Sequence, residues 1–296
     1  MGSISTYSVK HDMAKPHDQT HFQKRMTEQE FDRLGRFIQD GYGIKMPDTK
    51  KLMLESRLNK RLKALQIDSF GDYIEHVFDH GKNYEIVHMI DLVTTNKTDF
   101  FREPDHFDLL RERVLPEFVK TREQVFDLRA WSAGCSTGEE PYTLAMVLSE
   151  FAESHRRFSF DILATDVSTQ VLEHARTAIY QESKILPVPE SLKKKYIRRS
   201  TEREKMQVRM SPALRSRVNF FRLNLMDERF TEVGKLDTIF CRNVLIYFDR
   251  DIQEKLIQHF CQHLKPGGYL FIGHSETLFS IDAPLRQVVP TVYRRI

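Results

Sequence analysis

The chain has 296 residues, 40% of them hydrophobic and 29% charged, which is the composition of a soluble globular protein with one large domain or two modest ones. A net charge of +3 is too small to indicate a nucleic-acid partner by itself, and no apolar run approaches the roughly 18 residues that suggest a membrane span. The N-terminus lacks the apolar segment of a signal peptide, and three cysteines without metal-ligand spacing indicate a reducing cytoplasm.

Residues 1–26 are polar, and we expect them to form a disordered tail. Their histidines (His11, His17 and His21) have no regular ligand spacing, so no metal site is expected. From Thr27 to about residue 93, apolar residues recur at helical spacing and no strand pattern occurs. The sequence therefore predicts a small all-helical N-terminal domain over residues 27–93, followed by a linker over residues 94–125.

One predicted helix of this domain, residues 50–65, is strongly basic. Only Asp48 and Glu55 balance its six basic residues, which are Lys50, Lys51, Arg57, Lys60, Arg61 and Lys63. Two interpretations remain open for this helix. It has either an ordinary solvated face or a surface that docks on an acidic partner.

The stretch that follows, from Thr94 to Pro104, is more distinctive than a plain linker. Asn96 and Thr98 offer hydrogen bonds in fixed directions, and Arg102 can hold a carboxylate bidentately. The rings of Phe100 and Phe101 either wall a pocket or pack at a domain interface. Helix capping remains the structural alternative for the polar residues.

Residues 126–142 predict a buried strand, a glycine turn at Gly134 and a helix that starts near Pro141. This arrangement is the usual approach for a nucleotide-like ligand in an open α/β sheet. It is not a phosphate loop, because Gly138 is followed by Glu139 and Glu140. Two carboxylates favour a positively charged ligand such as S-adenosylmethionine. The alternative is an ordinary turn whose acidic residues suit the helix dipole.

Further strands are predicted at residues 158–165, 218–222, 237–240 and 269–273, and they alternate with helices as in a parallel, doubly wound sheet. Asp166 follows the second strand, where such folds bind a ribose diol, although a helix cap is also possible there.

Residues 193–222 carry eleven basic residues against two acidic ones. Short strands at 196–199 and 207–210 could pair there, as an inserted module that attaches an acidic partner. Nucleic acid also fits its charge, but no aromatic residues stand at stacking intervals.

Five motifs in this order resemble those of the glutamate O-methyltransferases of methyl-accepting chemotaxis proteins, the CheR family. They are Thr-Asn-Lys-Thr-Asp-Phe-Phe-Arg (95–102), Ser-Thr-Gly-Glu-Glu-Pro-Tyr (136–142), Ala-Thr-Asp (164–166), Phe-Cys-Arg-Asn-Val-Leu-Ile-Tyr-Phe (240–248) and Gly-His-Ser-Glu (273–276). The resemblance covers about residues 27–296. It implies a class I S-adenosylmethionine-dependent methyltransferase sheet over residues 126–296, with an antiparallel β-subdomain inserted at about 190–217.

The resemblance also implies the functional residues, with residues 94–125 contributing to the cofactor site. Arg102 and Tyr247 would border the reacting methyl group. The implied cofactor contacts are Asn96, Thr98, Arg102, Glu140, Asp166, Asn224, Leu225, Arg242 and Asn243. The reaction would be methyl transfer to glutamate carboxylates of chemoreceptors in chemotactic adaptation, and the site would hold no metal.

Two other functions are weaker alternatives. An amino-methylating nucleic-acid enzyme often carries Asn/Asp-Pro-Pro-Tyr after the fourth strand, where this chain has Asn243-Val-Leu-Ile-Tyr247. A non-catalytic docking protein would have lost the cofactor residues.

We therefore expect a cytoplasmic enzyme that binds receptor helices through helix 50–65, with the 193–222 insert as a second contact. No nucleic-acid partner and no membrane insertion are expected. Some relatives tether themselves to a receptor pentapeptide, but the turn at 200–205 has no glycine, so we expect this enzyme not to require one.

Overall fold

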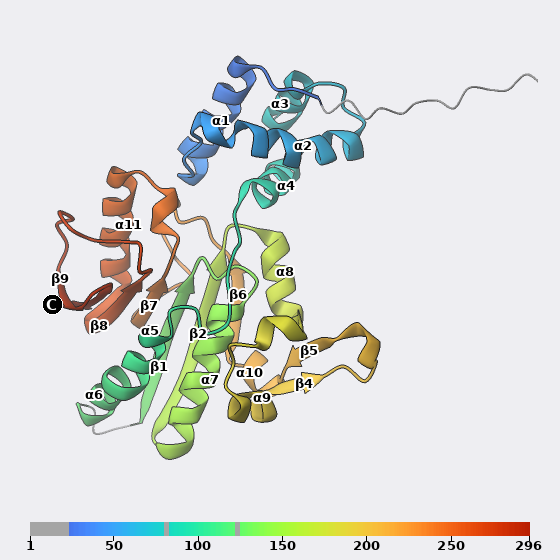
Figure 1. Ribbon diagram of the computed structural model, residues 1–296. Coiled ribbons are helices and arrows are strands. Elements are labelled where there is room, and N and C mark those ends of the chain that lie inside the picture. Colours follow the sequence, from blue (N-terminus) through green and yellow to red (C-terminus); the bar gives the residue numbers. More distant parts are fainter. Residues whose placement is uncertain (1–23, 80–82, 122–124) are drawn as a thin grey trace, which may run out of the picture.

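The computed structural model describes residues 24–79, 83–121 and 125–296, with a helical N-terminal part, an α/β part and a small side sheet (Figure 1). Most of the predicted tail, residues 1–23 with their histidines, lies outside the described residues. Residues 24–26 belong to the helical part instead. Met26 is buried, and its amide donates a hydrogen bond of 2.9 Å to Glu55. The predicted start of the helical domain at residue 27 is therefore slightly too late.

The N-terminal part is all-helical, as predicted. Its elements are α1 (Glu28–Tyr42), the 3₁₀ turn η1 (Asp48–Lys50), α2 (Lys51–Leu65), α3 (Phe70–Phe78) and α4 (Asn83–Val93). Helix α1 begins with a capping box, in which the side chains of Thr27 and Glu30 each accept a backbone N–H from the other residue. The helix ends at Gly43, whose φ of 71° is left-handed. Phe31 and Leu34 lie on its buried face, in a core shared with α2, α3 and α4.

The main sheet has seven strands in the order β6-β2-β1-β7-β8-β10-β9. Their bounds are β1 (Phe126–Ala133), β2 (Phe158–Asp166), β6 (Val218–Arg222), β7 (Leu236–Cys241), β8 (Leu264–Ile272), β9 (Leu285–Val289) and β10 (Val292–Arg295). Strands β6, β2, β1, β7 and β8 are parallel, and β10 is antiparallel to β8 and to β9. The predicted parallel, doubly wound sheet is confirmed.

Side chains alternate between the two faces of this sheet, and each face has its own core. On β1, Leu128 and Ala130 lie in the core beneath α7 (Glu139–Ser154), whereas Trp131 and Ala133 lie in the core beneath α11 (Arg250–His263). Helix α8 (Thr169–Thr177) packs beside β2 and β6. Both faces of the parallel strands are therefore covered, which accounts for the continuous burial of β7. Across the described ranges, no helix has the length and apolarity needed to cross a membrane.

The segment predicted as a linker, residues 94–125, is mostly helical. It forms α5 (Pro104–Leu109), the π-helical turn η2 (Leu110–Val114) and α6 (Leu115–Lys120). Phe107, Leu110 and Leu115 are buried in the same core as α7. The linker prediction is therefore wrong for residues 104–120, because their apolar spacing buries a face against the sheet.

The inserted subdomain is a three-stranded antiparallel sheet in the order β3-β5-β4. Its strands are β3 (Ile179–Gln181), β4 (Ile197–Arg199) and β5 (Gln207–Met210), and its helical turns are η3 (Glu182–Ile185), α9 (Glu190–Tyr196), η4 (Arg203–Lys205) and α10 (Pro212–Arg215). The predicted pairing of residues 196–199 with 207–210 is confirmed. The third strand lies before the predicted boundary at about residue 190, so the subdomain begins earlier, directly after α8.

Candidate active site

A cavity of about 280 Å³ lies at the carboxyl ends of β1, β2 and β7. Its walls come from the loops after these strands and after β6, from the segment 93–102 and from the helical domain. In an open α/β sheet this edge is where ligands bind. Every residue predicted for the cofactor or the methyl group is among those lining the cavity, namely Asn96, Thr98, Arg102, Glu140, Asp166, Asn224, Leu225, Arg242, Asn243 and Tyr247.

The floor of the cavity depends on the glycine turn after β1. Gly134 has a φ of 78°, and a Cβ placed on it would lie 2.5 Å from a methyl carbon of Val244. Any other residue would therefore push the loop after β1 away from the loop after β7. The next turn residue, Ser136, donates from its hydroxyl to the carbonyl of Asn96 at 2.8 Å. The turn thus connects the end of β1 with the 94–102 segment.

Asp166 is the acidic residue at the end of β2. One carboxylate oxygen accepts the amide of Ser136 at 2.9 Å, and the other accepts the amide of Ser168 at 3.0 Å. Burial raises the pKa of the Asp166 carboxyl, and these backbone hydrogen bonds oppose the rise. The cap of α8 is instead the hydroxyl of Ser168, which accepts the amide of Val171. Asp166 is therefore fixed in the cavity wall and is not the α8 cap.

The two glutamates at the start of α7 differ in their surroundings. Glu140 lines the cavity, where it accepts hydrogen bonds from the Ser132 hydroxyl at 2.7 Å and from Arg242 at 3.2 Å. Burial raises the pKa of Glu140, and the positive charge of Arg242 opposes that rise. Glu139 is also buried, but its partner is the Thr137 hydroxyl and it does not line the cavity. The preference for Glu140 over Glu139 agrees with this placement.

Arg242 is anchored behind the cavity by Glu103, which the sequence analysis did not single out. The guanidinium lies 2.9 Å from Glu103 and also donates to the backbone carbonyl of Arg102. Burial raises the pKa of Glu103, but Arg242, the His274 amide and Asn243 together outweigh that effect and the net pKa is lowered. The signal that sequence reasoning missed is the position of Glu103 directly after the Phe-Phe-Arg run, where it reaches the loop after β7.

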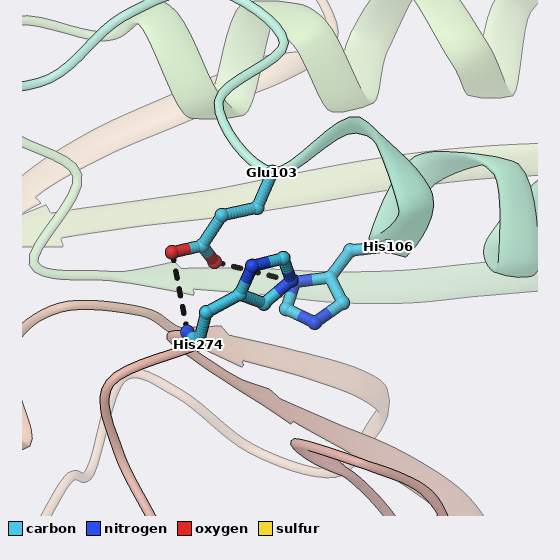
Figure 2. A group of neighbouring side chains, drawn as sticks. All are labelled: Glu103, His106 and His274. Atoms are coloured by element: carbon cyan, nitrogen blue, oxygen red, sulfur yellow. Dashed lines mark hydrogen bonds and ion pairs between the residues drawn. The ribbon is translucent and has the colours of Figure 1, made fainter.

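Figure 2 shows Glu103 with His106 and His274, a set of residue types that could bind a transition metal. Both oxygens of Glu103 already accept hydrogen bonds, from Arg242 on one side and from Asn243 and the His274 amide on the other. The neighbouring guanidinium would repel a cation. We therefore assign this cluster to the anchoring of Arg242 and not to metal binding.

The 94–102 segment forms a wall of the cavity with Tyr247. The Tyr247 hydroxyl lies 3.5 Å from the carbonyl of Thr95, and Arg102 donates to the carbonyl of Lys97 at 3.1 Å. Burial raises the pKa of Tyr247, and the positive charge of Arg102 opposes the rise. The phenol therefore stays protonated at neutral pH and can donate a hydrogen bond.

The two phenylalanines of this segment do not line the cavity. Phe100 is buried against Tyr180 of β3, with ring centroids 5.1 Å apart, and Phe101 packs on Phe107 of α5 at 5.8 Å. Of the two interpretations, packing between structural units is the one that the geometry supports.

The helical domain closes the cavity with Tyr42, Ile44 and Lys50, none of which the sequence analysis placed in the site. Asn224 joins the two domains, because its amide donates to the carbonyl of Gly41 at 2.8 Å. The amide of Lys45 likewise donates to the carbonyl of Tyr247 at 3.0 Å. No sequence signal for these contacts exists, since they depend on how the two domains meet.

The basic helix α2 is less free than its composition suggests. Arg57 donates to the carbonyls of residues 92, 93 and 94 at the end of α4. Arg61 forms a two-bond ion pair with the fully buried Glu85, at 2.9 and 2.6 Å. These two arginines stabilise the helical domain, which leaves fewer charges of the helix for a partner than its composition suggests. Lys60 and Lys63 are exposed on the same helix.

Three of the eleven basic residues of the insert are likewise balanced by neighbouring elements. Lys195 forms ion pairs with Glu150 and Glu153 of α7. Arg199 lies 3.4 Å from Glu182, and Lys193 lies 2.7 Å from Glu190. These acidic residues lie outside the 193–222 window, which is why the local charge count overstated the exposed charge.

The sheet order, its terminal antiparallel strands and a cavity at the carboxyl edge that contains Glu140 and Asp166 define a class I S-adenosylmethionine-dependent methyltransferase. Comparison with known proteins makes this more specific. The model of the CheR methyltransferase SAM-binding domain matches residues 96–293, and the model of the CheR methyltransferase all-alpha domain matches residues 29–94. The chain therefore belongs to the CheR methyltransferase family. It is an S-adenosylmethionine-dependent chemotaxis protein methyltransferase.

Relatives support this assignment along nearly the whole chain. A chemotaxis protein methyltransferase of Borreliella burgdorferi is 41% identical over 273 residues, which cover 91% of this chain and 95% of that protein. The chemotaxis protein methyltransferase of Salmonella typhimurium is 36% identical, over 90% of this chain and 90% of that protein. The chemotaxis protein methyltransferase of Escherichia coli is 35% identical, over 94% of this chain and 96% of that protein. The similarity thus spans both the helical and the α/β parts.

Proposed function

We propose that this protein transfers the methyl group of S-adenosylmethionine to glutamate side chains of chemoreceptors and produces methyl esters in chemotactic adaptation. The observation that supports this most is the single cavity lined by every residue predicted for the cofactor and for the methyl group. Among its lining residues, the carboxylates of Glu140 and Asp166 suit a ligand that carries a sulfonium, an amino group and a ribose. The reaction is the one that the names of the relatives indicate, methylation of a chemotaxis protein.

Within this proposal the acidic residues bind the cofactor. Asp166 holds the ribose hydroxyls, as carboxylates at the end of the second strand do in such sheets. Glu140 interacts with the positively charged end, while Arg242 keeps that glutamate oriented at 3.2 Å. Asn96, Thr98, Asn224, Leu225 and Asn243 complete the lining. Bound S-adenosylmethionine supplies an electrophilic methyl group on a sulfonium.

The receptor glutamate needs no general base. Its unperturbed pKa is about 4.3, so the carboxylate is already ionised and nucleophilic at neutral pH. Attack is an in-line displacement in which the charges of carboxylate and sulfonium cancel, so a dry cavity favours the transition state and positioning supplies much of the rate. Arg102 orients the carboxylate, and the protonated Tyr247 aligns one of its oxygens.

The experiment that tests this function is based on the product. Receptor cytoplasmic helices are incubated with the enzyme and S-adenosylmethionine labelled in the methyl group, and the receptor is then treated with mild alkali. A methyl ester hydrolyses and releases volatile methanol, whereas an N-methyl group survives. Label retained on the receptor would contradict the proposal and indicate an amine acceptor. A parallel reaction with Asp166→Ala controls for label bound without enzyme activity.

The details of docking are a further part of the proposal. We place the enzyme in the cytoplasm, where its three buried free thiols remain reduced. Receptor helices would contact α2 through its exposed residues, Lys60 and Lys63, with the basic insert as a second contact. Lys50 belongs to the cavity lining, where its ammonium lies 5.8 Å from the Tyr247 ring centroid.

A further inference from the structure

We infer that Glu276 is a positioning residue that holds the loop 243–247 in the form that methyl transfer needs. This inference rests on the proposed function, because Asn243 and Tyr247 belong to the predicted site. Glu276 ends the Gly-His-Ser-Glu motif, and it does not line the cavity itself. Its effect on the reaction would pass through the loop that it binds.

The contacts of Glu276 are nearly all with backbone amides. One carboxylate oxygen accepts the amides of Gly273 at 2.6 Å and Asn243 at 3.0 Å, and the other accepts the amide of Ile246 at 3.2 Å. Its side chain is buried, with 7% of the residue exposed. Among the residues that the structure describes, no cationic side chain forms an ion pair with Glu276. A buried carboxylate bound in this way organises backbone rather than neutralising a charge.

The chain around Glu276 is shaped so that its carboxylate reaches the neighbouring strand. The amide of Glu276 donates to the carbonyl of Gly273 at 2.9 Å, which closes a tight turn after β8. A Cβ on Gly273 would lie 2.5 Å from the side-chain nitrogen of Asn243 and 2.7 Å from its backbone nitrogen. Because β7 and β8 are parallel neighbours, this turn and the loop after β7 meet at the same edge of the sheet. Glycine at position 273 permits that approach.

The loop held by Glu276 has an unusual backbone and carries part of the cavity wall. Asn243 has a φ of 57°, in the left-handed region that asparagine adopts more readily than most residues, and Glu276 accepts its amide in this conformation. Asn243, Val244, Ile246 and Tyr247 all line the cavity. Loss of the carboxylate would leave the buried amide of Gly273 and the partly buried amides of Asn243 and Ile246 without their acceptor and would release this wall.

The same turn also supports Arg242. The amide of His274 and the side chain of Asn243 both donate to one oxygen of Glu103, at 3.2 and 3.3 Å. The other oxygen of Glu103 binds Arg242. Displacement of the 273–276 turn would therefore disturb two walls of the cavity together, which predicts an effect on both cofactor affinity and turnover.

The test compares two buried carboxylates on the full chain. Glu276→Gln keeps the size of the side chain but replaces one carboxylate oxygen with an NH₂ group, which cannot accept a hydrogen bond from a backbone amide. We expect at least tenfold weaker binding of S-adenosylhomocysteine by calorimetry and at least a tenfold lower kcat with receptor. Asp237→Asn is the control, because Asp237 is also buried, lies at the opposite end of β7 away from the cavity, and binds the Arg129 amide at 3.0 Å and the Lys265 ammonium at 3.0 Å. It should lower the melting temperature without changing either constant.

Glu276→Asp retains the charge on a shorter side chain and should recover part of the loss. Affinity and kcat of Glu276→Gln within twofold of wild type would overturn the inference. So would equal losses in Asp237→Asn, since they would reflect stability alone. If Glu276→Gln does not fold, the test uses Glu276→Asp. Weaker binding of S-adenosylhomocysteine and a lower kcat in Glu276→Asp would support the inference, and values within twofold of wild type would overturn it. The calorimetric arm needs no receptor, so a wild-type protein that binds S-adenosylhomocysteine but esterifies no receptor would contradict the proposed function alone.

Discussion

The backbone amide of Ser136 donates a hydrogen bond of 2.9 Å to the carboxylate of Asp166. This bond joins two motifs that are thirty positions apart, the turn after β1 and the end of β2. The amide of Ser168 donates to the other carboxylate oxygen at 3.0 Å. Together the two hydrogen bonds fix the orientation of the Asp166 carboxylate. The carboxylate is thus positioned by the backbone before any ligand arrives, which reduces the entropy that binding would cost.

Replacing Asp166 with alanine should weaken S-adenosylhomocysteine binding at least tenfold. Two hydrogen bonds from ribose hydroxyls to a charged group would be lost, each worth about 1.5–3 kcal/mol. Calorimetry on the folded variant measures the effect. Asp161→Ala serves as the control, because Asp161 lies on the same strand with an exposed side chain. An Asp166→Ala protein that binds as tightly as wild type would remove Asp166 from the cofactor site.

The sheet and the site were predictable from the sequence for different reasons. Strand β6 was placed correctly because three of its five residues are apolar (Val218, Phe220 and Phe221). The site was predictable because parallel neighbours bring their carboxyl ends together wherever they lie in the chain. Strand β3 was missed because its three residues have no pattern of their own and depend on pairing with Val208 and its neighbours on β5. Composition also could not distinguish Arg57 and Arg61 from the exposed lysines of α2, since only the packing of α4 decides which side chains turn inward.

Removing the charge of Arg61 should destabilise the helical domain. Arg61→Met leaves Glu85 buried with only the Tyr73 hydroxyl, which lies at 3.0 Å, as a side-chain partner. Breaking one side of a buried ion pair costs about 3–5 kcal/mol. Urea unfolding followed by circular dichroism measures the loss. Lys60→Met, one residue earlier and exposed, should change the unfolding free energy little. Equal stability of the two variants would show that the pair contributes nothing.

Reversing the exposed lysines should weaken receptor binding without affecting the cofactor. Lys60→Glu combined with Lys63→Glu should raise the KM for receptor and leave the Kd for S-adenosylhomocysteine unchanged. The wild-type KM should also rise with salt, because exposed charges are screened over roughly 8–10 Å at physiological ionic strength. Steady-state methylation at two salt concentrations provides the measurement. A KM that is independent of salt would mean that the lysines form an ordinary solvated surface.

His106 should make stability depend on pH in the acidic range. Burial and the nearby Arg242 lower the pKa of His106 to about 4, whereas an unfolded histidine titrates near 6.5. Between these values the unfolded chain binds more protons, so the contribution of His106 to stability is present above pH 6.5 and is lost as the pH falls toward 4. The full loss is about 3 kcal/mol.

The measurement is urea unfolding at several pH values between 4 and 7, for wild type and for His106→Gln. Glutamine keeps a nitrogen near Thr291 Oγ1, which the histidine contacts at 2.8 Å, but it does not titrate. The unfolding free energy of wild type should therefore fall relative to that of His106→Gln as the pH is lowered from 7 to 4. Parallel curves would show that His106 keeps an ordinary pKa in the folded protein.

The last prediction concerns tethering to a receptor pentapeptide, which some relatives bind as an added strand on the inserted subdomain. Here β4 lies at the edge of that subdomain, and its three residues include two arginines. The following turn contains no glycine between residues 200 and 205, and Lys205 and Glu202 form an ion pair at 2.9 Å across it. Short strands with charged side chains resist strand addition at an edge. Titration with a pentapeptide that carries tryptophan and phenylalanine should therefore show no binding at micromolar concentrations. Clear micromolar binding would instead make the insert a tether and reduce the need for docking through α2.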